Sequence, residues 1–427
     1  MNLKKALEYY TDSLMNEIKA INKSRKTLLI ENIASLSLLQ WINYIVPLFL
    51  IPFLVRSLGI ELFGLVMFAQ SVSTIFITFS DLGFSITGTR KISILNEDKK
   101  QISEIFWSIT TIKVAALILL FGVLLLLIAF VPKFSKEPLL FIFSFGVTIG
   151  STVFPSWFFQ GIQKMKIITV VNITAKLIFA LLVVIYVTSP DDYLLVPLFN
   201  SSGFIIAGLS GLIYATRHVT FLGPKLKNIK TQIKETAPVL LSSIATTLYT
   251  SSNILILGFL TNNTITGVYA SFEKMILALK GVYGPIYQAM FPWLSTKKDI
   301  NEFIKKTGTY VFIIGLTGTF FLIICSKQIL ERVFRDELIT SYNIGFQLIS
   351  IVMFLSGMNM LYNFLFLSAK KEYILRMKIL VTTSLIGLSL SIILTISFGI
   401  YGTIIAVVLT ELILLIWGYF TYKKLTL

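Results

Sequence analysis

Charged side chains occur inside long apolar segments of this sequence, where each of them is costly. Lys280 lies near the middle of one such segment, and Glu273 lies seven residues earlier on the same side of a helix, next to Lys274. A charge at the centre of a bilayer costs about 2.5–3.5 kcal/mol on the insertion scale, so such groups normally face protein or water. A cationic, hydrated cavity for an anionic substrate would explain them. A buried Glu–Lys pair that holds two helices together is the alternative.

Further polar residues are candidates for the same cavity, in three other apolar segments and at their cytoplasmic ends. Because basic residues at bilayer depth favour an anionic substrate, the predicted substrate-binding residues, with one amide, are Lys280, Lys274, Lys176, Arg90 and Asn253. Because carboxylates can exchange H⁺ or Na⁺, the predicted ion-coupling residues are Glu273, Glu411 and Asp81. For Arg90, an ordinary position beside the inner leaflet is the alternative. Lys113 is predicted to extend its amine to the cytoplasmic interface.

Two segments also carry polar stripes at helical spacing. One stripe contains Gln70, Thr74 and Thr78, and the other contains Ser242, Thr246 and Asn253. Such stripes either join helices by hydrogen bonds or form the wall of an aqueous path.

Composition places these residues in a membrane protein. The 427 residues are 55% hydrophobic and only 14% charged, and the mean hydropathy is +0.83. Soluble domains have about 25% charged residues, so a soluble enzyme is excluded, and one cysteine excludes a disulfide scaffold. A span needs about 20 apolar residues. We therefore expect an all-α integral membrane protein with about twelve transmembrane helices.

The distribution of basic residues predicts the orientation. Of the 37 Lys and Arg residues, 27 fall in alternate connections and the two terminal segments, and only 6 fall in the other connections. Basic residues in short loops stay cytoplasmic, so both termini are predicted to be cytoplasmic. The net charge of +16 is then explained by the basic residues of the cytoplasmic segments, and nucleic acid is not expected as a partner. Residues 1–29 have no signal-peptide pattern; they read as an amphipathic helix on the inner leaflet or as a frayed tail.

The two halves of the sequence show a weak repeat. Glu31 precedes Gly64 by 33 residues, Glu235 precedes Gly267 by 32, and Gln70 and Glu273 follow the two glycines by six. We expect an N-lobe at 30–216, a cytoplasmic linker at 217–235 and a C-lobe at 236–427, each lobe with six spans. Transporters built from such repeats hold the substrate between the halves. Coincidence of spacing is the alternative.

Missing motifs narrow the function. The sequence has neither a phosphate-binding GxxxxGK[ST] loop nor a Cys/His metal set, so no cofactor is expected apart from a coupling H⁺ or Na⁺. External connections are short, which disfavours an enzyme. A membrane glycosyltransferase or polymerase would need an external carboxylate pair, for which the adjacent Asp191 and Asp192 are the candidates. A cation-coupled multidrug antiporter is the closer alternative.

Three stretches resemble a known family: YIVPLFLIPFLVRSLGIELFGLVMFAQSV (44–72), FSDLGFSITGTRKIS (79–93) and FFQGIQKMK (158–166). They are similar to Wzx-type O-antigen and polysaccharide flippases of the multidrug/oligosaccharidyl-lipid/polysaccharide (MOP) exporter superfamily. The resemblance implies a MATE-like fold of two six-helix lobes in the bacterial inner membrane. It implies transfer of undecaprenyl-pyrophosphate-linked repeat units from the cytoplasmic to the periplasmic leaflet. The implied partners are this lipid-linked oligosaccharide, membrane lipids, a polysaccharide polymerase and a chain-length regulator.

Overall fold

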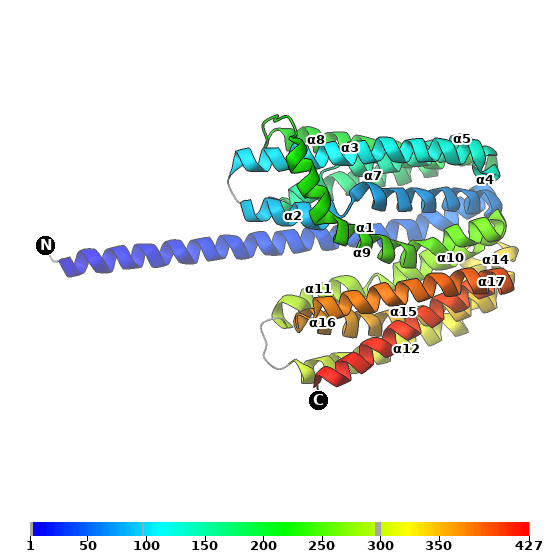
Figure 1. The fold of residues 1–427 in the computed structure, drawn as a ribbon. Helices are drawn as coiled ribbons and strands as arrows, with labels where there is room; N and C mark the ends of the chain where they lie inside the picture. The colour runs from blue at the N-terminus through cyan, green and yellow to red at the C-terminus, as the bar shows by residue number, and fades with distance from the viewer. Residues whose placement is uncertain (1–2, 96–97, 295–299, 427) are drawn as a thin grey trace.

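The computed structural model describes residues 3–95, 98–294 and 300–426, with side chains from Glu31 onward except at a few positions. Within these residues every regular element is a helix (Figure 1). The first half contains α1 (Leu3–Asp81), α2 (Phe84–Leu95), α3 (Lys99–Phe130), α4 (Pro132–Ser135), α5 (Pro138–Val153), α6 (Ser156–Gly161), α7 (Met165–Tyr186), η1 (Pro190–Leu194) and α8 (Leu195–Thr216). The backbone of 3–29 is helical, but the side chains that would make this segment amphipathic lie outside the described residues.

In its described residues, the second half is also helical. It contains α9 (Leu226–Leu260), α10 (Asn263–Lys280), α11 (Tyr283–Leu294), α12 (Asn301–Ile324), α13 (Ser326–Val333), α14 (Glu337–Ser341), α15 (Asn343–Asn359), the π-helix η2 (Met360–Phe366), α16 (Leu367–Ala369) and α17 (Tyr373–Thr426).

Many of these helices can cross a bilayer. Eight helices in the described part of the chain are long and apolar enough, or nine if the bent pair 228–248 and 251–260 counts as one span. Two of the eight contain a break at a glycine with positive φ, Gly59 (φ 75°) and Gly399 (φ 56°). At Gly399 the chain folds back on itself, since the hydroxyls of Thr395 and Thr403 lie 2.7 Å apart. Gly59 makes the same kind of reversal in α1 (Figure 1).

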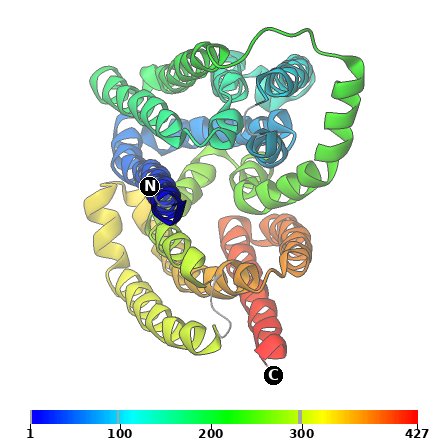
Figure 2. The ribbon, with the colours of Figure 1, turned by 90° about the vertical axis from the view of Figure 1, so that its left-hand side faces the viewer.

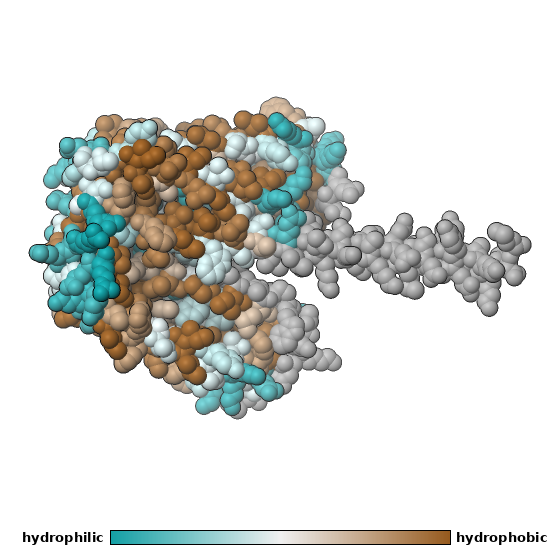
Figure 3. All heavy atoms as spheres, turned by 180° about the vertical axis from the view of Figure 1, so that it is seen from behind, coloured by the Kyte–Doolittle hydropathy of each residue, from teal (hydrophilic) through white to brown (hydrophobic). Residues whose placement is uncertain are grey.

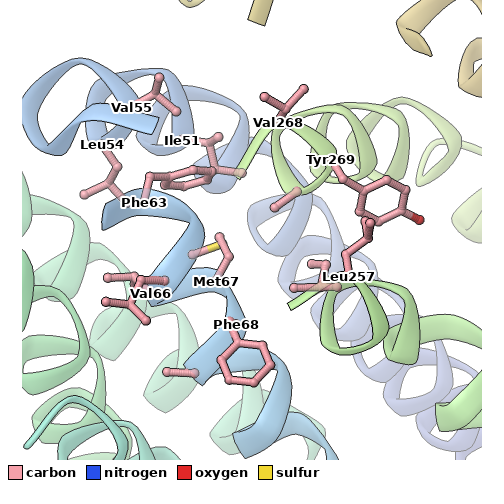
Figure 4. Close-up of a cluster of buried hydrophobic side chains, with 14 of the residues drawn as sticks. Ile51, Leu54, Val55, Phe63, Val66, Met67, Phe68, Leu257, Val268 and Tyr269 are labelled. Carbon is pink, nitrogen blue, oxygen red and sulfur yellow. The ribbon is translucent and has the colours of Figure 1, made fainter. Parts of the chain in front are cut away.

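The helices form two groups (Figures 1 and 2). We call residues 60–81 of α1 together with α2, α3, α5, α7 and α8 the N-terminal bundle, and α10–α12, α15 and α17 the C-terminal bundle. Residues 60–81 of α1 pack closely against α10, and this contact joins the bundles. Figure 4 shows part of the apolar core at this junction, where Phe63, Val66 and Phe68 from α1 lie near Leu257, Val268 and Tyr269.

Helix α9 contacts both bundles. Its first half reaches the N-terminal bundle, where the hydroxyls of Thr247 and Thr78 lie 2.9 Å apart. Its second half reaches α17 of the C-terminal bundle, where Ser391 donates to Asn253 Oδ1 at 2.7 Å. The connection before α9 is fastened to α3, because Lys225 forms an ion pair with Glu104 at 3.0 Å.

The surface fits a bilayer. Hydrophilic residues gather at the two ends of the face in Figure 3, and apolar residues cover the area between them. Exposed leucine, isoleucine, valine and phenylalanine side chains are numerous on this chain, as in Phe49, Ile118 and Ile396. Lipid tails solvate such side chains, whereas water does not. The chain is therefore a multi-pass membrane protein.

Candidate functional site

Two adjoining cavities lie along the seam between the bundles. The larger, of about 800 Å³, is lined mostly by helices of the first half, α1, α2, α3, α5, α6, α7 and α8, and reaches the seam through a few residues of α9 and α10. The smaller, of about 290 Å³, is lined by α1, α9, α10, α15 and α17. Gln70, Thr74 and Lys274 line both, so the two cavities meet at the centre of the molecule. A volume of about 300–1,000 Å³ is typical of ligand pockets.

Two lysines face the larger cavity without a carboxylate partner in the described residues. Lys176 projects from α7 and donates to the side-chain oxygen of Asn43 at 2.9 Å and to its backbone oxygen at 3.3 Å. Lys274 projects from α10 and lines the same cavity. Two cations held near each other in a cavity lower the free energy of a bound anion. Asn43 was not predicted, although an amide in an apolar segment is the signal that singled out Asn253.

Asp81 also lines the larger cavity, together with Lys113. Lys113 Nζ lies 3.5 Å from Asp81 Oδ1, and its residue is only 3% exposed. The prediction that Lys113 extends to the interface is wrong, because a carboxylate close to its helix draws the ammonium inward. Asp81 has a second role as a helix cap, since it accepts from the backbone N–H of Ser85 at 3.2 Å.

The smaller cavity contains an ion pair between helices. Lys280 of α10 lies 3.8 Å from Glu411 Oε1 of α17. Glu411 is buried and also accepts from Ser356 Oγ at 3.0 Å and from the amide of Asn359. A buried carboxylate needs such donors, so these two α15 residues are part of the site. The sequence did not reveal these two partners, because they lie more than 50 residues before Glu411 in the chain.

Glu273 and Asn253 complete the wall of the smaller cavity. Glu273 accepts from the hydroxyl of Tyr269 at 3.3 Å, one turn earlier on α10. The alternative reading, a Glu–Lys pair that holds two helices together, applies to Glu411 and Lys280; Glu273 forms no such pair with a lysine of another span among the described residues. Asn253 is buried and is held by Ser391 of α17.

Two sequence expectations differ from the structure in position. Arg90 is exposed on α2 and is not among the residues that line either cavity. The stripe on α9 is displaced by one residue, because Ser243 and Thr247 line the larger cavity, whereas Ser242 and Thr246 donate to backbone oxygens of their own helix. The stripe on α1 faces the larger cavity as an aqueous wall would, with Gln70, Thr74, Thr78 and Asp81.

The adjacent pair Asp191–Asp192 has a structural role. Asp192 Oδ2 accepts from the backbone N–H groups of Ser189 at 2.8 Å and Thr188 at 3.0 Å. This geometry caps η1, where a carboxylate satisfies donors that have no helical partner. Among the described residues no group of three or more His, Cys, Asp or Glu side chains is arranged to hold a metal ion.

Comparison with known families assigns the chain. A family model described as "Polysaccharide biosynthesis protein" matches residues 29–298, which is more than half of the sequence. The chain belongs to the polysaccharide biosynthesis protein family. This membership confirms the resemblance found in the three sequence stretches.

Two relatives of this family member match nearly its whole length. A protein of Escherichia coli (strain K12) named "Putative O-antigen transporter" is 30% identical over 401 residues, covering 91% of this chain and 95% of the relative. A protein of Shigella dysenteriae with the same name is 27% identical over 402 residues, covering 91% and 98%.

Solved structures show the same fold. The MATE multidrug transporter DinF-BH aligns with a TM-score of 0.63 at 17% identity, covering 93% of this chain and 95% of that one. The lipid II flippase MurJ, in an inward closed conformation, aligns with a TM-score of 0.58 at 18% identity, covering 86% of each chain. This polysaccharide biosynthesis family member therefore has a MATE- and MurJ-like fold. Its relatives are transporters, which confirms the prediction that it is not an enzyme.

Proposed function

We propose that this protein is a flippase for undecaprenyl-pyrophosphate-linked O-antigen or a related polysaccharide repeat unit. One observation carries the proposal: Lys176 and Lys274 line the same cavity from two different helices, and among the described residues neither forms an ion pair with a carboxylate within 4 Å. A diphosphate is the chemistry that two such ammonium groups would bind. The relatives named as O-antigen transporters support this assignment of the substrate.

The physical barrier explains why a cavity is needed. Each sugar hydroxyl that enters hydrocarbon without a partner costs about 4–8 kcal/mol. A hydrated cavity between the bundles removes that cost, while the polyprenyl chain stays in the lipid. An inside-negative potential drives anions outward, so moving two negative charges to the periplasmic side is favourable by about 2.3 kcal/mol per charge per 100 mV. The potential therefore assists transfer to the periplasmic leaflet.

The proposal includes the membrane arrangement. We place twelve spans in the bacterial inner membrane, with both termini in the cytoplasm, an N-lobe at 30–216, a linker at 217–235 and a C-lobe at 236–427. The breaks at Gly59 and Gly399, which divide α1 and α17 into two helices each, support a number above eight. The uneven distribution of Lys and Arg supports the orientation.

Coupling to an ion is the second part of the proposal. Glu411, Glu273 and Asp81 are the candidate carriers of H⁺ or Na⁺, and Lys280 would respond to the charge of Glu411. Arg90, exposed on α2, would contact lipid head groups at the inner leaflet. The measurement is transport in vesicles with and without an ionophore. Equal transport in both would remove the coupling role.

Two proteins of the same process are proposed as partners. A flipped repeat unit must be polymerised, so a polysaccharide polymerase and a chain-length regulator would act on the product. Co-purification from membranes in which all three are expressed would test the contact.

The decisive experiment uses a strain in which the gene is deleted. Lys176→Gln and Lys274→Gln should abolish surface glycan, and the lipid-linked precursor should accumulate on the cytoplasmic face. Lys305→Gln, at an exposed position of α12 outside both cavities, is the matched control and should restore export. Normal glycan export by the double variant Lys176→Gln/Lys274→Gln would refute the role of these lysines.

The multidrug antiporter is the second candidate, because the buried acidic group Glu411 in the smaller cavity is suited to a cationic substrate. It predicts that deletion sensitises cells to cationic dyes and leaves surface glycan intact. The flippase predicts the reverse pair of results.

A further inference from the structure

Lys133 makes an unusual contact at the end of the molecule near Gly59. It lies in α4, the short helix after α3, and its ammonium donates to the carbonyl oxygen of Gly258 on α9. Gly258 lies in the last turn of α9, where carbonyl oxygens lack helical donors and a cation is favourable. The same ammonium lies 4.8 Å from the centroid of the Phe68 ring. Lys133 therefore contacts a carbonyl of α9 and a ring of the N-terminal bundle at once.

Four phenylalanine rings surround this contact. Phe68 meets the edge of Phe259 at 5.2 Å and that of Phe134 at 6.0 Å between centroids. Phe134 and Phe141 lie 4.3 Å apart. Gly258 is packed so closely that a Cβ atom there would lie 2.1 Å from the Phe68 ring. Phe68, Phe134 and Phe141 are buried, so apolar packing fills the seam at this end.

The contact joins parts that belong to different bundles. Phe68, Phe134 and Phe141 lie on the N-terminal side, whereas the second half of α9 is fastened to α17 through Asn253 and Ser391. The larger cavity extends instead toward the opposite end, where Ser85 and Ile86 line it. The seam is thus closed near Gly59 and hollow toward α2.

We propose that Lys133 is a latch that holds the two bundles together at the outer end and must release for the cavity to open outward. The inference rests on the proposed transport function and adds its regulation. No carboxylate forms an ion pair with Lys133 in the described residues, so release exchanges one neutral carbonyl for water. Burial, together with the positive charge of Lys136, lowers the pKa of Lys133, which indicates that the ammonium is held against its preference for water.

The test measures from which side the cavity is reached. A cysteine is placed at Gln70, which lines both cavities, in a Cys325→Ser background that removes the native thiol. A membrane-impermeant maleimide is added to right-side-out and to inside-out vesicles. The parent protein, which carries only Gln70→Cys and Cys325→Ser, should react with the maleimide mainly from the cytoplasmic side. Because a hydrogen bond from a charged donor is lost, Lys133→Met should raise the outside-to-inside labelling ratio about tenfold.

Two variants act as controls. Lys327→Met removes an exposed lysine that pairs with Glu331 of its own helix, and it should leave the ratio unchanged. Lys133→Arg retains a cation and donors, and it should keep the ratio near that of the parent. A ratio for Lys133→Met equal to that of the parent would overturn the latch while the transport function stands. Absence of labelling at Gln70→Cys from both sides would instead refute the cavity on which both proposals rest.

Discussion

Gly64 and Gly267 occupy corresponding positions in the two halves of the sequence, and they pack directly against each other. A Cβ atom on Gly64 would lie 2.6 Å from the backbone nitrogen of Gly267, and one on Gly267 would lie 3.2 Å from Gly64 Cα. The residues six positions later, Gln70 and Glu273, both line the smaller cavity. This contact is the arrangement that the predicted repeat of the two halves would produce around a two-fold axis.

This contact predicts a sharp difference between two glycines. Gly64→Ala would place a methyl group 1.9 Å from the carbonyl oxygen of Asn263, and overpacking of this kind costs about 1–3 kcal/mol. We expect a lower unfolding temperature in detergent and loss of glycan export. Gly122→Ala on α3, where a Cβ atom meets nothing within 4 Å, should leave both unchanged. Equal unfolding temperatures for the two variants would contradict the close contact.

A second prediction concerns the buried carboxylate of the smaller cavity. Glu411→Ala leaves Ser356 without this acceptor and Lys280 without its ion pair, while Asn359 keeps only its bond to the backbone oxygen of residue 411. Unsatisfied groups of this kind cost about 1–3 kcal/mol each. Glu411→Gln retains an acceptor oxygen and should be less destabilised. Thermal unfolding of the two variants provides the comparison, and an alanine variant as stable as the glutamine variant would argue against the network.

A third prediction separates structure from transport at Asp81 and Lys113. Removal of one partner of a buried ion pair costs about 3–5 kcal/mol, whereas replacement of both is often neutral. Lys113→Met should therefore unfold at a lower temperature than the double variant Asp81→Asn/Lys113→Met. If Asp81 also carries the coupling ion, the double variant will be stable but inactive. A double variant less stable than Lys113→Met would show that the two side chains do not act as a pair.

The fourth prediction addresses the external acidic pair. Asp192→Asn weakens the cap of η1 and should cost about 1 kcal/mol, whereas Asp191, which accepts none of these bonds, should tolerate asparagine. Surface glycan should be normal in both variants. Loss of glycan assembly with retention of stability would instead indicate catalysis at this pair. Thermal unfolding and glycan electrophoresis measure the two outcomes.

The membrane class and the family were predictable from the sequence because hydrophobic length and loop charge act locally. Charges at bilayer depth were also found by position alone, and Lys274, Lys176 and Glu411 do line cavities. Their partners were not found. Whether Lys280 pairs with Glu273 or with Glu411 depends on which helices become neighbours, and helical spacing within one segment contains no such information.

Helix rotation explains the displaced stripe. On α9 the cavity faces Ser243 and Thr247 instead of the predicted residues one position earlier. A shift of one residue turns a helix by about 100°. Because apolar residues cover most sides of this helix, its sequence does not define the face that points to the cavity more closely than that. Arg90 illustrates the same limit, because the position of α2 relative to the seam follows from packing.

Helix α9 is held by hydrogen bonds on both sides of its bend. Its first half contacts the N-terminal bundle through Thr247, its second half contacts α17 through Asn253 and also Lys133 through Gly258, and the two halves meet at 58°. Rocking of one bundle against the other would therefore break the Lys133 contact or flex α9 between residues 248 and 251. Relaxation of that segment to its present bend would return the two bundles to the conformation described here when no substrate is bound.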